Sequence, residues 1–215
     1  GLLGGLVSST ATTLSFSRHA RASSAMIPVA VIVIVLANLV VLVRLAVLAA
    51  VLAPGVLAQL LPVLAGGMVA GGLGAAYGVR RLHPQGELPA LAMSNPTELR
   101  TALGFGLMYG VVLLAAAGLS DWLGNRGLYA VALLSGLTDV DAITLSSLRL
   151  HNLGTLSVAV LVNVITLATL ANLAFKSVLA LFIGGWPMAR HAIAGMGAVA
   201  LGLVLTWAII RGFSA

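Results

Sequence analysis

The sequence predicts an all-α integral membrane protein, a polytopic bundle of about seven transmembrane helices. Of its 215 residues, 60% are hydrophobic and only 7% are charged, whereas soluble domains are about half apolar and about one quarter charged. The mean hydropathy is +1.14. The apolar blocks are long enough for helices, which need about 20 residues to cross a bilayer. They do not show the alternation that is typical of membrane barrel strands.

Prolines, glycines and charges divide the chain into its expected helices. The first block ends before Arg18, and Pro28 fits the first turn of the second helix, where a missing N–H is tolerated. Asn95 and Pro96 indicate the cap and first turn of the fourth helix, with Glu98 completing a capping box. We expect helices over 1–17, 26–52, 56–79, 96–119, 128–148, 155–183 and 189–210, in a single domain covering 1–215.

Small residues and buried amides indicate how the helices pack. The helix over 56–79 carries glycines at four-residue spacing, a pattern that allows two backbones to approach closely in lipid. Asn38 and Asn172 are expected to form interhelical hydrogen bonds. The predicted packing residues are Gly67, Gly71, Gly74, Gly78, Asn38 and Asn172.

An internal repeat relates the start of the chain to its middle. Residues 2–18 align with 133–149 at a constant offset of 131, with nine of seventeen positions identical. Weaker similarity continues into the following helices, around Asn38 and Asn172, which gives repeat units of about 1–52 and 132–183. Four expected crossings separate the copies, so we expect a parallel repeat in which both have the same orientation.

Two carboxylates interrupt the second copy. Asp139 and Asp141 should lie roughly 15 and 12 Å from the end of their helix at Arg149, near the bilayer midplane. A charge at that depth costs at least about 2.5 kcal/mol. Arg44 and Lys176 are expected roughly 27 and 31 Å from the cytoplasmic ends of their helices, at the outer interface, where long basic side chains reach water. They are therefore not expected to pair with the aspartates.

A break in the helix would bring the two carboxylates together. Positions i and i+2 point about 200° apart on a regular helix, so the aspartates share a cavity only where the helix is unwound. Gly136 favours such a break, and Ser8 and Thr10, which align with the two aspartates, indicate a matching break in the first helix. Two interrupted helices meeting at the midplane would suit a hard cation or a proton. The expected cation or proton site contains Asp139, Asp141, Ser8, Thr10, Thr138, Thr144 and Asn163, with Asp139 and Asp141 as ligands of Mg²⁺ or another divalent cation.

A structural interpretation of the same residues stays open. One aspartate would be protonated and hydrogen-bonded to a neighbouring helix, and the other would face a crevice. The chain has no nucleophile–base pair, phosphate loop or metalloprotease spacing, and it has no cysteine. We therefore do not expect an enzyme or a resident cofactor.

The basic residues indicate orientation rather than nucleic-acid binding. The net charge is +6, but the arginines lie at block ends, as the positive-inside rule requires. Alternating crossings put seven arginines on one side and two on the other, which predicts that the richer side, with the C-terminus, is cytoplasmic. The seven are Arg18, Arg21, Arg80, Arg81, Arg100, Arg149 and Arg211, and the two are Arg126 and Arg190. No signal peptide is expected, and a chain that opens within a helix is expected to be a processed or truncated product.

Four segments carry a resemblance to a known family. Residues 1–13, 95–99, 134–146 and 171–176 resemble the C-terminal domain of bacterial membrane proteins related to the MgtC/SapB family, the domain of unknown function 4010. The resemblance implies membrane proteins loosely tied to magnesium transport. It also implies an N-terminal membrane half ahead of the first segment, which this sequence does not contain, and an aromatic residue where Thr97 stands.

Two functions are consistent with these observations. The first is a permease domain for a divalent cation, or a proton-coupled one, with its site on the interrupted first and fifth helices. The second is a non-transporting structural or accessory subunit of a larger inner-membrane complex. The expected partners are the lipid bilayer and either further copies of the chain or other subunits.

Overall fold

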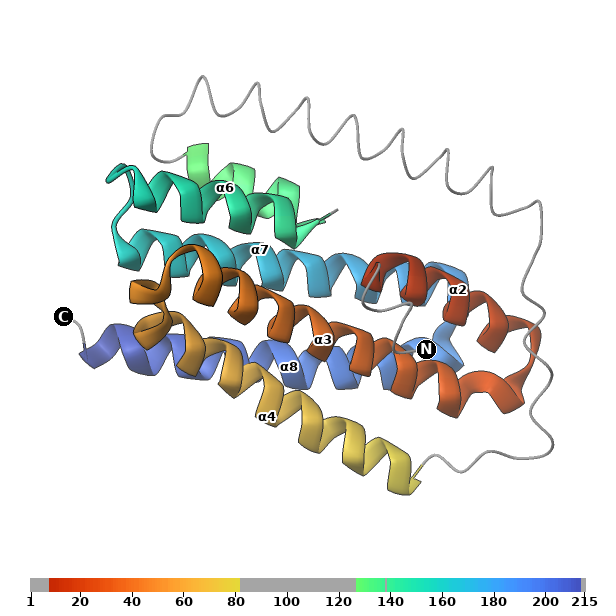
Figure 1. The fold of residues 1–215 in the computed structure, drawn as a ribbon. Coiled ribbons are helices and arrows are strands. Elements are labelled where there is room, and N and C mark those ends of the chain that lie inside the picture. The colour runs from red at the N-terminus through yellow and green to blue at the C-terminus, as the bar shows by residue number, and fades with distance from the viewer. Residues whose placement is uncertain (1–7, 82–126, 138, 214–215) are drawn as a thin grey trace.

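The computed structural model describes residues 8–81, 127–137 and 139–213, and the regular elements of this part of the chain are helices (Figure 1). The expected all-α architecture is therefore confirmed, while the helix expected over 96–119 lies outside the described residues. The helices are α2 (Ser9–Ala22), α3 (Ile27–Leu52), α4 (Leu57–Arg81), a short helix Gly127–Leu137, α6 (Val140–Asn152), α7 (Val158–Leu179) and α8 (Trp186–Phe213).

Four segments are long and apolar enough to cross a membrane, which indicates a multi-pass membrane protein. They are Ser24–Leu52, Pro54–Gly78, Val158–Gly184 and Trp186–Arg211. A 3₁₀ turn precedes both α3 and α4, and α7 continues as a π-helical turn over Ala180–Gly184. Gly185, with a φ of 75°, then reverses the chain into α8, a backbone conformation that favours glycine.

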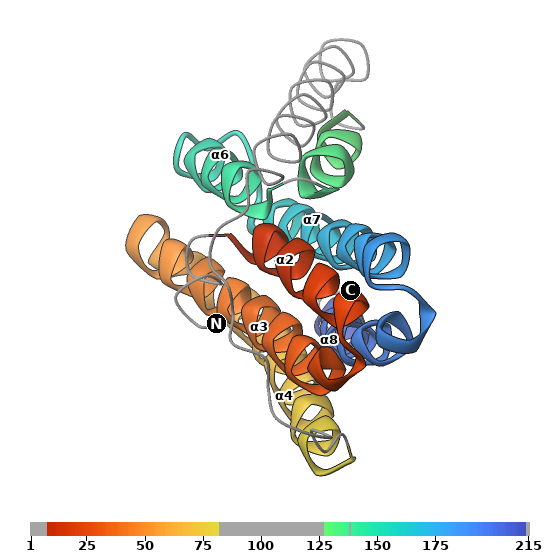
Figure 2. The ribbon, with the colours of Figure 1, turned by 90° about the vertical axis from the view of Figure 1, so that its right-hand side faces the viewer.

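The long helices form two antiparallel pairs, α3 with α4 and α7 with α8 (Figures 1 and 2). One end of the bundle holds the end of α2 and the turn between α7 and α8, because Gly184 lies beside Ser17 and Gly185 beside Arg21. We call this the Arg18 end. The opposite end, the Arg149 end, holds the ends of α3 and α6, where the Asn152 side chain donates a hydrogen bond of 2.7 Å to the Leu52 carbonyl.

The segment from Gly127 to Asn152 is a hairpin of two short helices rather than one interrupted crossing. The helix Gly127–Leu137 runs in the direction of α7, because Tyr129 contacts Asn163 and Gly136 contacts Asn172. In contrast, α6 runs alongside α3 toward the Arg149 end. At about 1.5 Å per residue the arms are about 16 and 20 Å long, too short to cross a core of about 30 Å.

The expected single helix over 128–148 is therefore wrong, and the hairpin changes the orientation of everything after it. Helix α2 runs toward the Arg18 end and α6 toward the Arg149 end, so the two similar segments point in opposite directions and the expected parallel orientation is wrong. Arg149 and Arg211 lie at the opposite end from Arg18, whereas Arg190 lies at the Arg18 end. The expected division of the arginines was wrong because it counted the hairpin as a crossing.

Glycines bring α4 and α8 into direct backbone contact. A Cβ at Gly202 would collide with the Gly66 carbonyl oxygen, and a Cβ at Gly66 would lie 2.8 Å from the Gly202 oxygen. On the same seam Gly67 faces Leu203, and a Cβ at Gly71 would collide with Val199. Contact of this kind lets helices gain dispersion energy in lipid, where the hydrophobic effect between helices is lost.

We expect Gly202→Ala to lower the free energy of unfolding by about 1–3 kcal/mol, because backbone atoms of α4 cannot move away from the new methyl group. The matched control is Gly197→Ala on the same helix, where a Cβ would have no neighbour within 4 Å. This control should be neutral or stabilising by up to about 1 kcal/mol, since alanine favours helix more than glycine does. Thermal unfolding in detergent measures both, and equal effects of the two substitutions would contradict the prediction.

Candidate functional site

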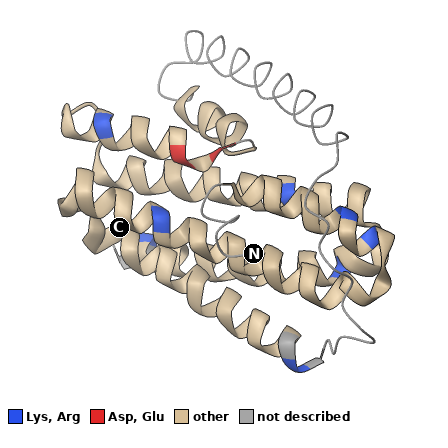
Figure 3. Ribbon diagram, turned by 45° about the vertical axis from the view of Figure 1, so that its right-hand side comes forward, with Lys and Arg blue, Asp and Glu red and all other residues tan. Residues whose placement is uncertain are grey.

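A polar cavity of about 180 Å³ lies where α2 and α6 begin, part of the way along the bundle. In Figure 3 the acidic segment of the hairpin lies between the two ends of the bundle, and several of the Lys and Arg residues lie near those ends. Helices α3 and α7 supply the remaining walls. The cavity is lined by Ser8, Ser9, Thr10, Val41, Arg44, Asp139, Val140, Asp141 and Asn172.

Each of the two short helices starts with a side-chain cap at this cavity. Ser8 is extended, and its Oγ accepts a hydrogen bond of 3.2 Å from the Ala11 amide. Asp139 is also extended, and its Oδ1 accepts one of 2.9 Å from the Asp141 amide. Helix N-termini carry a partial positive charge, so both of them favour a negative group in the cavity. This field and the cap stabilise the Asp139 carboxylate at a depth where a bare charge would be costly.

Asp141 forms an ion pair with Arg44 of α3. The Arg44 Nε donates a hydrogen bond of 3.0 Å to Asp141 Oδ1, and a second guanidinium nitrogen lies 2.5 Å from Oδ2. This fork-to-fork geometry engages both carboxylate oxygens. The expectation that depth would keep the two residues apart is wrong, because α6 runs beside α3 toward the same end rather than away from it.

Lys176 of α7 is the most deeply enclosed charged group among the described residues. Its side chain is fully buried, with an exposed fraction of 0%. The ammonium donates hydrogen bonds of 2.7 Å to Ser9 Oγ and 2.8 Å to Asn38 Oδ1. The expected position at the outer interface is wrong, since Asn38 is near the middle of α3. Ser9 connects this lysine to the cavity wall.

Close packing on α7 fixes the tip of the hairpin. The Asn172 amide donates a hydrogen bond of 2.8 Å to the Gly136 carbonyl, which satisfies a backbone oxygen near the end of a helix. A Cβ at Gly136 would collide with the Ala168 carbonyl oxygen. The glycine thus allows the helix Gly127–Leu137 to touch the backbone of α7.

The structure brings together four of the seven residues of the expected site, namely Ser8, Thr10, Asp139 and Asp141. Asn163 does not line the cavity; it contacts Tyr129 and accepts a hydrogen bond of 2.8 Å from Trp207 Nε1. Thr144 is buried on α6 and is not part of the cavity wall. Thr138 lies outside the described residues.

Sequence reasoning missed the two basic residues at the site and assigned Asn172 to packing alone. A signal was present, because Arg44 and Lys176 interrupt apolar blocks just as the aspartates do. Intramembrane charges commonly pair with one another. The pairing is excluded only if the fifth helix crosses as a single span, and α6 runs in the opposite direction.

The donor set bears on which ions the cavity could take. Within the described residues there is no group of three or more His, Cys, Asp or Glu side chains that could hold a metal ion. Asp141 is already engaged by Arg44, which leaves Asp139 as the carboxylate that no described basic side chain pairs with. Hydroxyl and amide oxygens supply the other polar groups of the wall.

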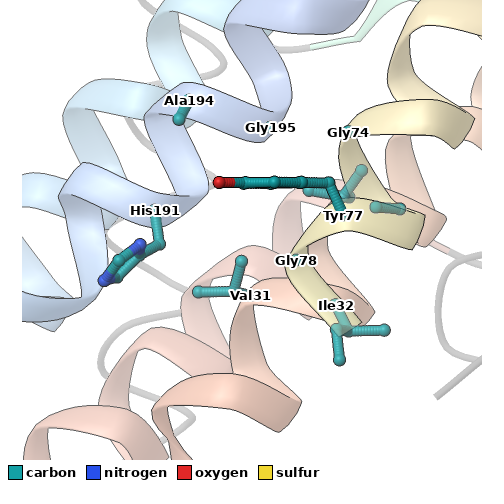
Figure 4. A pocket seen from close by; sticks show the side chains of 10 residues that line it. Val31, Ile32, Gly74, Tyr77, Gly78, His191, Ala194 and Gly195 are labelled. Carbon is teal, nitrogen blue, oxygen red and sulfur yellow. The ribbon is translucent and has the colours of Figure 1, made fainter. Parts of the chain in front are cut away.

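A second cavity, of about 360 Å³, is largely apolar and lies toward the Arg18 end between α3, α4 and α8 (Figure 4). The Tyr77 ring extends from α4 across it toward α8, and His191 lies at its side. Gly74 and Gly78, expected to pack against another helix, both line this cavity. Among the described residues, a Cβ at Gly74 would meet Ala198 of α8 closely, at 3.3 Å, and one at Gly78 would have no neighbour within 4 Å. The packing along α4 is therefore closest at Gly67 and Gly71, looser at Gly74, and not found at Gly78.

Comparison with known proteins places the chain in a family. Residues 1–184 match the model of the family described as Domain of unknown function (DUF4010). The chain belongs to this family. The chain is also similar to an uncharacterized protein of Aquifex aeolicus (strain VF5). The two are 31% identical over 186 residues, which cover 85% of this chain and 80% of that protein. No solved structure matches the chain. The region matched by the DUF4010 model includes every described residue that lines the polar cavity.

A double-mutant cycle tests the Arg44–Asp141 pair. Arg44→Gln should lower the free energy of unfolding by about 2 kcal/mol, because it leaves a half-buried carboxylate without its partner. Adding Asp141→Asn to it should cost little more, so we expect a coupling energy of about 1–2 kcal/mol. The control is Arg149→Gln, an exposed cation on the same helix as Asp141, which should change stability by less than about 0.5 kcal/mol. Additive effects of Arg44→Gln and Asp141→Asn would contradict the pairing.

Proposed function

We propose that the chain is a cation-transporting membrane domain whose ion site is the polar cavity between the N-termini of α2 and α6. The observation that carries this proposal is the meeting of two short helices, each beginning part of the way along the bundle, at a cavity with two carboxylates. Carboxylates within a membrane are costly and are commonly part of an ion or proton pathway. The proposal covers divalent cations such as Mg²⁺ and monovalent cations alike.

Asp139 is the carboxylate that would bind the ion. One of its oxygens caps α6, and no described basic residue forms an ion pair with it. Ser8 and Thr10, at the start of α2, contribute hydroxyl groups to the cavity wall. Oxygen ligands of this kind suit hard cations, and a wall made partly of neutral hydroxyl groups holds an ion weakly enough for release.

The arrangement of the helices supports transport over a purely structural role. Many secondary transporters contain two related units of opposite orientation, with discontinuous helices and a site near the bilayer midplane at their interface. The segments 2–18 and 133–149 are similar in sequence, and α2 and α6, which overlap them, point in opposite directions. We propose that these two units form an inverted repeat and that rocking of one against the other exposes the cavity to each side in turn.

The distribution of described arginines supports an orientation. Arg18, Arg21, Arg80 and Arg190 lie toward the Arg18 end, and Arg149 and Arg211 toward the Arg149 end. By the positive-inside rule the Arg18 end would face the cytoplasm of a bacterial inner membrane. The C-terminal end of α8 would then be on the outer side, in contrast to the expectation from the sequence.

Asp139→Asn tests the proposal, because it keeps the shape and the α6 cap while removing the charge. In proteoliposomes we expect it to lower cation flux at least about tenfold, which corresponds to about 1.4 kcal/mol of lost stabilisation of the ion in the site. Flux of Mg²⁺, Na⁺ and K⁺ should each be measured with an entrapped dye for that ion.

The matched control is Thr169→Val, which changes a buried hydroxyl on α7 that is bonded to the Ile165 carbonyl and is not part of the cavity wall. This control should retain flux. Equal flux in the wild type and Asp139→Asn, or no flux of any of the three cations in the wild type, would overturn the proposal. Those outcomes would instead support a structural subunit of a larger assembly.

A further inference from the structure

We infer that the domain exchanges a monovalent cation for a proton. The cavity binds one monovalent cation each time Lys176 releases its proton. The inference rests on the proposed function and deepens it, because it names the class of ion and the ion that moves in the opposite direction. It is carried by the enclosure of Lys176, by its hydrogen bonds to neutral groups and by the balance of charge around the cavity.

The ammonium of Lys176 is buried without a carboxylate partner. No described Asp or Glu lies within ion-pair distance of it, and both of its hydrogen-bond acceptors, Ser9 Oγ and Asn38 Oδ1, are uncharged. Buried charges in proteins are ordinarily paired, because an unpaired one loses its hydration. Loss of the proton from Lys176 would remove this unpaired buried charge.

The charged groups that act on Lys176 come from two neighbouring helices. They are Arg44 on α3, which opposes the charge on the lysine, and Asp139 and Asp141 on α6, which favour it. No described ionisable group on α2 or α8 adds to these three. The carboxylates that line the cavity thus also stabilise the positive charge on Lys176. A cation bound beside Asp139 offsets this stabilisation and favours release of the lysine proton.

Counting charges selects the valence of the ion. Asp139 and Asp141 contribute two negative charges, and Arg44 and Lys176 contribute two positive charges, so these four groups are neutral together. When the Lys176 Nζ releases one proton through the Ser9 hydroxyl toward the cavity and solvent, one monovalent cation restores that neutrality. A divalent cation would leave one excess positive charge in a low-dielectric region, which is costly. The N–H bond that breaks is replaced by an O–H bond of the accepting solvent, the electron pair stays on Nζ, and no electron is transferred.

Ser9 connects Lys176 to the cavity through a hydrogen bond. Its hydroxyl lines the cavity and also accepts the hydrogen bond from Lys176 Nζ. A neutral amine can accept a hydrogen bond, so loss of the proton allows the Ser9 hydroxyl to reverse its role and donate to Nζ. The cavity wall therefore changes its hydrogen-bonding character together with the charge on the lysine.

The test compares the pH dependence of cation binding in two substitutions of Lys176. NaCl and KCl are titrated separately into the purified full chain in lipid nanodiscs, from about pH 6 to about pH 9, with binding followed by calorimetry. In the wild type the apparent Kd of the bound cation should fall about tenfold for each pH unit over the range in which Lys176 is protonated in the free protein and neutral in the cation-bound protein, because one proton then leaves for each cation bound. Liposomes containing a pH-sensitive dye should show one proton moving against each cation.

Lys176→Met removes the titrating group and should leave cation binding that changes by less than about twofold over the same pH range. Lys176→Arg keeps a charge that does not titrate, so it should weaken binding at least about tenfold at the upper end of the range and also abolish the pH dependence. Arg149→Met, at an exposed position on α6, is the control and should behave as the wild type. If Lys176→Met does not fold, as judged by its elution and melting profile, the Lys176→Arg result decides.

Two results would overturn the inference while leaving the proposed function intact. The first is a pH dependence in Lys176→Met, or in Lys176→Arg, equal to that of the wild type, combined with lost binding in Asp139→Asn. The second is binding of MgCl₂, titrated in the same way, that is lost in Asp139→Asn while neither Na⁺ nor K⁺ binds. Undiminished binding of every cation in Asp139→Asn would instead overturn the proposed function itself.

Discussion

Two helices begin inside an apolar bundle, so their first backbone N–H groups lie where little water is available to accept hydrogen bonds. The polar side chains of the site are arranged around the need to provide those acceptors. Lipid offers no hydrogen bonds, so irregular backbone at this depth is tolerated only where protein or a polar cavity surrounds it. Ser8 and Asp139 cap the two helices, and Asn172 bonds the carbonyl of Gly136 at the hairpin tip. Polar groups are therefore required at this position by the helix starts themselves, whatever the cavity binds.

The charged groups depend on this arrangement in turn. Asp139 is favoured by the N-terminus it caps, and its neighbour Asp141 is engaged by Arg44 from the facing helix. Lys176 approaches from the other side through Ser9. Each charge lies in the field of the others, which makes their combined neutrality more important than any single pair. Removing one of them changes the environment of all.

Much of the fold was predictable because hydropathy over about 20 residues is a strong signal. The long apolar blocks, the interruption near Gly136 and the similarity of 2–18 to 133–149 all appear in the sequence itself. The direction of the chain after the interruption was not predictable in this way. A kinked crossing and a hairpin have the same composition, and only the contacts of Gly136 with α7 and of Asp141 with Arg44 distinguish them. Because the hairpin was expected to be a single crossing, Arg149 was assigned to the wrong end and the pairing of Arg44 with Asp141 was not predicted.

The shortness of the hairpin arms has a consequence for how the protein is made. Helix α6 combines a brief span with Asp141, Arg149 and several hydroxyl side chains, and such a segment gains too little free energy to leave the insertion machinery for lipid unaided. Asp141 and Asn152 find partners on α3, which is synthesised earlier, and Gly136 in the preceding helix finds one on α7, which is synthesised later. We therefore expect the hairpin to take its place in the bundle only after α7 has been synthesised.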